Sequence, residues 1–113
     1  WVPHFMYRMD HAYERHRYWL TGSAITRLPS EYFRDNVYTT FQDDWVAFQV
    51  KDLCNIRRLM WANDFPHSDS TWPDSQALLA KHAAHLTSEE RDLILHDNVA
   101  ELYALDARPE TSR

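Results

Sequence analysis

At 113 residues the chain is close to the usual length of a single domain, and its 44% hydrophobic and 14% aromatic residues argue against a disordered protein. Its 17 acidic and 12 basic residues give a net charge of -5 and are spread along the chain, so no basic stripe is available for a nucleic acid. Cys54 is the single cysteine, no apolar stretch approaches the ~20 residues of a membrane span and no signal peptide opens the chain, which together predict a soluble, cytoplasmic protein without a membrane partner.

The first predicted element is a helix from Val2 to about Leu20, because apolar residues recur there in steps of three and four. Pro3 suits its first turn, and the opposite face is charged, which is typical of a helix with one side in water. The Thr-Gly-Ser stretch at residues 21–23 breaks the helix. A short helical segment is expected from Leu28 to about Asn36, as a connector.

A strand, a helix and a second strand are predicted next. Residues Val37–Phe41 are β-branched or aromatic and carry no charge, which is typical of a buried strand. Asp44 can cap a helix from Trp45 to about Leu53, and a second apolar strand is expected from about Arg58 to Ala62. A unit of this length predicts two parallel strands with a right-handed crossover.

Two further helices are predicted in the last third of the chain. Trp72-Pro73-Asp74 is typical of a helix start, and that helix is expected to run to about His85. Thr87 and Glu90 have the spacing of a capping box, in which each side chain accepts a hydrogen bond from the other residue's backbone. The helix that they begin is expected to end near Leu105.

The order of these elements predicts an α/β fold with too few strands for a complete sheet, because both strands would keep an unpaired edge. We therefore expect the C-terminal fragment of a (β/α)₈ TIM barrel, about strands seven and eight with their helices, since a whole barrel takes ~250 residues. A start at Trp1 and a single glycine, Gly22, also indicate a piece of something longer. Residues 1–106 are expected to form this part of the domain, and residues 107–113 a flexible tail.

Several segments resemble one known family in the right order. "NDFPHSDSTWP" at residues 63–73 and "HDNVAELYALD" at residues 96–106 resemble the C-terminal end of the amidohydrolase-related, metal-dependent TIM-barrel family, which includes the aminocarboxymuconate-semialdehyde and resorcylate decarboxylases. The upstream segments "WVPHFMYRMD", "LPSEYFRDNVYTTFQDD" and "LMWANDFPH" also resemble this family around strands six to eight. The resemblance covers residues 1–106.

The resemblance implies roles for Asp64 and His67. The family's acid at the end of strand eight binds or faces a catalytic divalent metal, usually zinc, and handles a proton, and Asp64 occupies that place. By itself, an aspartate before Phe-Pro is more often a turn or cap residue. His67 either orients a metal ligand or contacts the substrate, or it makes a hydrogen bond that stabilises the loop.

Other polar residues are expected to have structural roles. His82 and His85 lie three residues apart on a predicted helix, but no third metal ligand lies close to them in the sequence. Capping of a helix explains Asp44, and Asn98 matches an asparagine for which a structural hydrogen bond is expected. The family's His-x-His pair is missing, so this fragment alone is expected to be inactive.

Two functional hypotheses follow. The first is the C-terminal part of an enzyme that hydrolyses C–N or C–O bonds with metal-activated water, or decarboxylates an aromatic or unsaturated acid, as the resemblance implies. Its partners would be a small-molecule substrate and, because strand edges are exposed, a second copy of the chain. The alternative is a small non-catalytic helical module for binding or oligomerisation.

Overall fold

A computed structural model describes residues 1–19 and 25–105 of the chain. In chain order the helices and strands are α1 (Val2–His16), α2 (Pro29–Asn36), β1 (Thr39–Phe41), α3 (Trp45–Gln49), β2 (Leu59–Trp61), α4 (Ser75–His82), α5 (Ser88–Asp92) and α6 (Asn98–Leu102). Two 3₁₀ turns, Lys51–Leu53 and Ile56–Arg58, precede β2, and a π-helical turn, Leu93–Asp97, joins α5 to α6. The predicted flexible tail at 107–113 lies outside the described residues.

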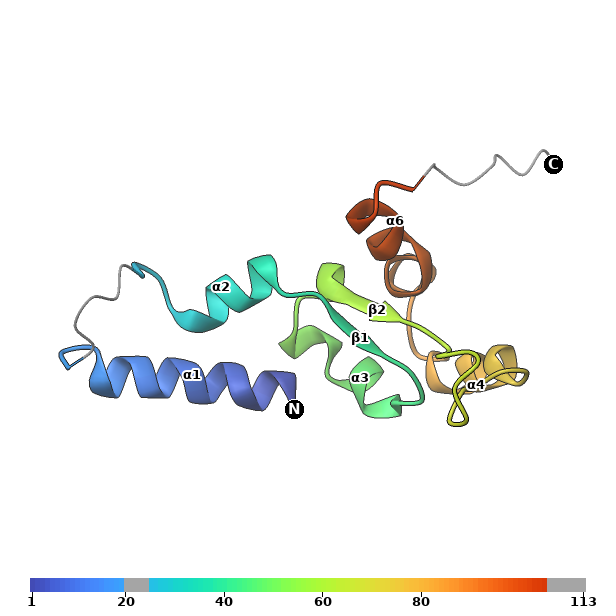
Figure 1. Ribbon diagram of the computed structural model, residues 1–113, viewed down its shortest axis with the longest axis horizontal. Coiled ribbons are helices and arrows are strands. Elements are labelled where there is room, and N and C mark those ends of the chain that lie inside the picture. The colour runs from blue at the N-terminus through green and yellow to red at the C-terminus, as the bar shows by residue number, and fades with distance from the viewer. Residues whose placement is uncertain (20–24, 106–113) are drawn as a thin grey trace.

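The two strands lie side by side and run parallel, as predicted (Figure 1). Thr39 is paired with Leu59, Thr40 with Met60 and Phe41 with Trp61. Both strands are shorter than the predicted Val37–Phe41 and Arg58–Ala62. The backbone N–H groups of Val37 and Arg58 are held by the preceding helical turns, through bonds to Phe33 O and Asn55 O, and so are not available to a strand ladder.

Alternate residues of each strand face opposite sides of the sheet. Leu59 belongs to the buried core, together with residues from the helices: Phe48, Leu79, Ala83, Leu86 and Ile94. Phe41 and Trp61 pack against the same core, so this side of the sheet is covered by helices. Thr40 and Met60 share the other side. On that side Thr40 is exposed, whereas Met60 is buried. The protein is therefore α/β, as predicted, with its core cluster packed against the opposite side of a two-stranded sheet.

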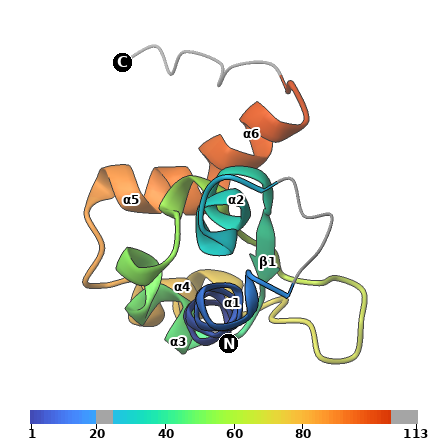
Figure 2. The same ribbon diagram turned by 90° about the vertical axis from the view of Figure 1, so that its left-hand side faces the viewer.

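The helices lie in two groups, one around the sheet and one beyond it. In both overall views α6 lies toward the top of the molecule and α3 and α4 toward the bottom, while α1 and α2 form a pair beyond the sheet (Figures 1 and 2). Val2 and Met6 are the buried residues of α1. The helix ends at His16, before the predicted end at Leu20, and Leu20 and the predicted break at 21–23 lie outside the described residues.

Two other predicted helices are shorter in the structure. The helix predicted over Trp45–Leu53 leaves the α conformation at Val50, which has φ -99° and ψ 9°, and continues as a 3₁₀ turn. The helix predicted over Trp72–His85 begins at Ser75 and ends at His82, since Ala83 has φ -100° and ψ 15°. Asp44 does cap α3, because its Oδ1 accepts from the backbone N–H of Ala47 at 3.3 Å.

The predicted capping box is present at the start of α5. Thr87 Oγ1 accepts from the N–H of Glu90 at 3.2 Å, and Glu90 Oε2 accepts from the N–H of Thr87 at 2.9 Å. The second carboxylate oxygen of Glu90 lies 2.7 Å from Lys51 Nζ. Glu90 therefore fixes the first turn of α5 and also connects it to the 3₁₀ turn Lys51–Leu53.

This double role predicts a pH dependence of stability. The hydrogen bonds from Lys51 and Thr87 lower the pKa of Glu90 below its ordinary value. A group with a lowered pKa in the folded state stabilises the protein above its unfolded pKa, about 4.3 for glutamate, and loses that effect as the pH falls through the folded pKa. Urea denaturation is expected to show that Glu90→Gln is destabilising at neutral pH, and that its difference from the unmodified protein shrinks on acidification below about pH 4.

The neighbouring Glu89 provides the control for this measurement. It lies in the same first turn of α5, and replacing it with glutamine removes the same charge without touching Lys51. Glu89→Gln is expected to change the stability less than Glu90→Gln at neutral pH. A difference between Glu90→Gln and the unmodified protein that stays constant from neutral to acidic pH would contradict the assignment.

Candidate functional site

Asp64 lies just beyond the carboxyl end of β2, at the position expected from the sequence. Its backbone has φ 59°, in the left-handed region that few residues other than glycine adopt, although aspartate tolerates it better than most. This conformation turns the chain sharply after the strand. The carboxylate is about half exposed, with 54% of the side-chain surface accessible.

His67 turns back to Asp64 through both its backbone and its side chain. The N–H of His67 donates to Asp64 O at 2.9 Å, and its Nδ1 lies 3.1 Å from Asp64 Oδ2. His67 can therefore stabilise the loop through its backbone and contact the Asp64 carboxylate through its side chain at the same time. Asp64 Oδ1 has no protein hydrogen bond among those found in the described residues.

The loop from Asn63 to Trp72 is held in shape by small polar residues. Asn63 Oδ1 accepts from the N–H of Phe65 at 3.2 Å, and its backbone oxygen accepts from Ser70 Oγ at 2.7 Å and from the N–H of Thr71 at 3.2 Å. Ser70 Oγ also accepts from the N–H of Trp72 at 3.1 Å. Asparagine and serine side chains commonly form such turn hydrogen bonds, and here they explain how Asp64 is held in place.

An open hollow connects the ends of the two strands. It has a volume of about 240 Å³ and is lined by Thr40, Phe41, Gln42, Ala62 and Asp64. Thr40 is exposed and belongs to the side of the sheet opposite to the core cluster. The hollow therefore joins Asp64 to that side of the sheet, and Gln42 is a lining residue that the sequence did not single out.

The other acidic and histidine residues near this edge do not converge on Asp64. His82 Nδ1 lies 3.7 Å from Asp43 Oδ1, which is within ion-pair range but too long for a hydrogen bond. His85 instead lies 3.4 Å from Gln49 Nε2 and from Phe48 O. The two rings therefore make separate contacts, His82 with the residue before the α3 cap and His85, beyond α4, with the end of α3.

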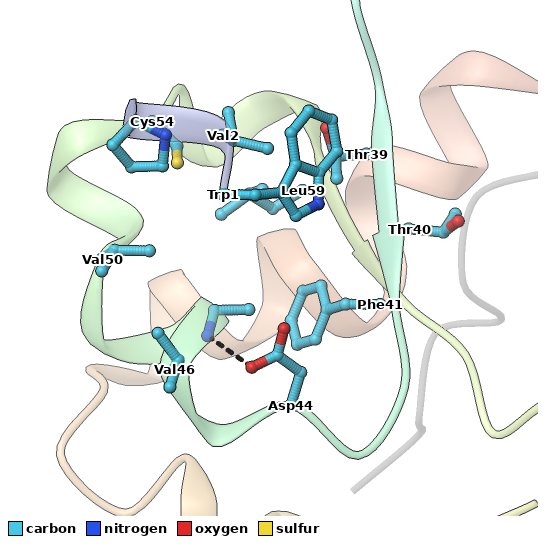
Figure 3. A pocket seen from close by; sticks show the side chains of 12 residues that line it. Trp1, Val2, Thr39, Thr40, Phe41, Asp44, Val46, Val50, Cys54 and Leu59 are labelled. Atoms are coloured by element: carbon cyan, nitrogen blue, oxygen red, sulfur yellow. Dashed lines mark hydrogen bonds between the residues drawn. The ribbon is translucent and has the colours of Figure 1, made fainter. Parts of the chain in front are cut away.

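A separate apolar pocket lies on the helix side of β1. Figure 3 shows its lining side chains, which include Trp1, Val2, Phe41, Val46, Val50 and Cys54. Asp44 also lines it, but its carboxylate is bonded to the N–H of Ala47, and Thr40 points away from the pocket. Burial raises the pKa of the Cys54 thiol, which lowers its reactivity. Most of the lining side chains are apolar, which is typical of a packing gap.

Known proteins share both sequence and fold with this chain. Residues 2–105 match the family described as Amidohydrolase. The chain belongs to the amidohydrolase family. No curated protein matched it significantly.

A solved structure shows which fold the amidohydrolase chain shares. The crystal structure of 5-carboxyvanillate decarboxylase LigW from Sphingomonas paucimobilis superimposes with a TM-score of 0.76 and 18% sequence identity. The match covers 93% of this chain and 31% of the decarboxylase, so the chain spans about a third of the length of that protein. It is a small α/β fragment of an amidohydrolase TIM-barrel fold, which confirms the predicted barrel fragment but not which strands it contains.

This portion of the protein offers few ligands for a metal ion. Amidohydrolase-family proteins are typically metal-dependent. Within residues 1–19 and 25–105, no three histidine, cysteine, aspartate or glutamate side chains are arranged to hold a metal ion. Asp64 offers one carboxylate, whereas a catalytic zinc site uses about three protein ligands. The described residues thus do not form a metal site on their own.

Within residues 1–19 and 25–105, no helix is long and apolar enough to cross a membrane.

Proposed function

We propose that this chain is the C-terminal part of a metal-dependent enzyme of the amidohydrolase family, with β1 and β2 as the seventh and eighth strands of its barrel. The enzyme would hydrolyse C–N or C–O bonds, or decarboxylate an aromatic or unsaturated acid. The observation that carries the proposal is the position of Asp64, whose half-exposed carboxylate lies beyond the carboxyl end of β2 beside an open hollow. Active sites of (β/α)₈ enzymes lie at that end of the strands.

In this proposal Asp64 is both a metal ligand and a proton acceptor. A bound divalent ion, zinc by preference, would lower the pKa of a coordinated water to ~7. Asp64 would be placed to accept a proton from such a water at the carboxylate oxygen that His67 does not contact. The remaining ligands would come from other parts of the whole protein, which is why this chain alone is expected to be inactive.

His67 is proposed to orient the carboxylate rather than to bind the substrate directly. The 3.1 Å contact between its Nδ1 and Asp64 Oδ2 supports this role, because it leaves the other oxygen of Asp64 directed elsewhere. Partners of this kind are worth about 10-fold to 100-fold in metal affinity or activity in metal sites. We therefore expect His67→Ala to lower turnover of the whole protein about tenfold.

A measurement of zinc binding tests the proposal as a whole. Zinc binding would be measured by isothermal titration for this chain alone and for the chain with the rest of the barrel restored. The extended protein is expected to bind one divalent ion, and the chain alone is expected to bind it much more weakly because one carboxylate cannot replace about three ligands. An extended protein without metal affinity would favour the non-catalytic reading.

Association with a second copy is a further part of the proposal. Large apolar side chains are exposed on the described residues, among them Trp1 at 71%, Phe5 at 55% and Tyr7 at 66% on or beside α1. Such side chains are compatible with contact either with the rest of the barrel or with another copy of the chain. A small-molecule substrate is the other proposed partner, in the whole protein.

A further inference from the structure

One side chain joins the two loops that meet at the hollow. Gln42 directly follows β1, and its Nε2 donates a hydrogen bond to Asp69 O in the loop that carries Asp64. The backbone oxygen of Gln42 accepts from Trp61 Nε1 at 2.8 Å, which fixes this residue to the end of β2. Gln42 is half-buried and lines the same hollow as Asp64.

The hydrogen bond from Gln42 to Asp69 O differs from the others that shape the loop. The hydrogen bonds of Asn63, Ser70 and Thr71 described above lie within the loop, and Thr71 Oγ1 adds a bond of 2.9 Å to Ser75 Oγ at the start of α4. They give the loop its internal shape and hold its end. Among the hydrogen bonds found within residues 1–19 and 25–105, the bond from Gln42 is the one that connects the middle of the loop to the end of β1. The loop also presents exposed apolar surface, with Phe65 60% accessible, so core burial contributes little to its position.

We propose that Gln42 is a positioning residue, which holds the Asp64 loop beside the end of β1 and thereby keeps the Asp64 carboxylate at the hollow. The consequence for turnover rests on the proposed function of Asp64, whereas the consequence for the loop does not. A carboxamide suits this task because its N–H₂ group donates to a backbone carbonyl without adding a charge beside Asp64. The bonds from Trp61 Nε1 to Gln42 O and from Ala62 N to Phe41 O join the strand ends, and the distance from β1 to the middle of the Asp64 loop would then depend on the Gln42 side chain.

The test uses the whole protein and two variants of Gln42. Gln42→Met keeps the length of the side chain and removes the donor without adding charge, and Gln42→Glu keeps its shape and replaces the donor with an acceptor. The matched control is Gln49→Met, since Gln49 is an exposed glutamine on α3, away from the loop. Amide hydrogen exchange is measured at His67 and Ser70, whose N–H groups donate to Asp64 O and His67 O.

Both Gln42 variants are expected to accelerate exchange at these two amides about fivefold to tenfold. The Gln49→Met control is expected to leave exchange there unchanged. Turnover then distinguishes positioning of Asp64 from a purely structural role of Gln42. Gln42→Met is expected to lower kcat about tenfold when Asp64 is present, and to have no further effect in an Asp64→Asn background, because both changes then act through the same carboxylate.

The outcomes separate this inference from the proposed function. Unchanged exchange at His67 and Ser70 in both Gln42 variants would overturn the role of Gln42, whatever the turnover. Where Asp64→Asn itself lowers kcat, equal losses from Gln42→Met in the presence and absence of the Asp64 carboxylate would also overturn it. Accelerated exchange in a protein whose turnover is insensitive to Asp64→Asn would support the loop-holding role and overturn the proposed function.

Discussion

Replacement of Asp64 by asparagine is expected to lower turnover of the whole protein about 100-fold or more, the usual range for loss of a general acid or base. Asparagine has the same size and also tolerates the left-handed backbone, with φ 59° at this position. The substitution therefore removes the charge and the basic oxygen while the loop keeps its conformation. The affinity for zinc is expected to fall as well, because a neutral amide is a poorer ligand than a carboxylate.

The control for this prediction is Asp69→Asn, in the same loop. Asp69 is exposed, and the contact with Gln42 uses its backbone oxygen rather than its side chain. The two variants make the same chemical change only a few residues apart, so general effects of charge on the loop cancel between them. Steady-state kinetics and zinc titration are the measurements. Equal turnover for the two variants would refute the role given to Asp64.

The second large effect is expected on stability, from Asn98. This side chain is 1% exposed, and its Nδ2 donates to Ile56 O at 2.7 Å and to Leu59 O at 2.8 Å. It therefore fixes the start of α6 to the start of β2. This confirms the structural hydrogen bond that was predicted for Asn98. Asn98→Ala leaves two carbonyl groups without this donor and opens a small cavity. The expected loss is at least ~2 kcal/mol of unfolding free energy in urea denaturation, since an unsatisfied buried polar group costs ~1–3 kcal/mol.

Two further variants make the Asn98 prediction specific. Asn98→Asp keeps the shape and replaces the donor with an acceptor that faces two carbonyl oxygens, so it is expected to destabilise at least as much as Asn98→Ala although it opens no cavity. Asn36 provides the matched exposed asparagine, with its Nδ2 donating to Tyr32 O at 2.8 Å within α2. Asn36→Ala is expected to stay within about 0.5 kcal/mol of the unmodified protein. An Asn98→Asp protein as stable as the unmodified one would contradict the argument.

The features that local sequence patterns determine were predicted correctly. The Thr87 and Glu90 capping box, the Asp44 cap and the parallel strand pair all depend on residues close to one another or on the composition of one short segment. The position of Asp64 beyond the second strand followed in the same way, from an apolar run ended by turn residues. Local hydrogen bonds and periodicity are sufficient for such features, because competing conformations of the same few residues lack them.

Element lengths were less well predicted, and each difference has a local cause that the patterns did not reveal. The backbone at Val50 and Ala83 leaves the α-helical region and shortens two helices. The π-helical turn Leu93–Asp97 interrupts what the apolar spacing presented as one continuous helix. Apolar periodicity records which side of a segment is buried, and it does not fix where the regular hydrogen bonding ends.

The sequence alone thus determined the fold class, the order of the elements and a carboxylate at the end of the second strand. Tertiary structure alone decided that Gln42 reaches Asp69 across 27 residues and that Asn98 reaches Leu59 across 39. It also decided that His67 faces Asp64, and that His82 and His85 take separate partners. The physical reason is that a side-chain hydrogen bond depends on distances of about 3 Å between segments, and those distances exist only after the core has packed the strands and helices together.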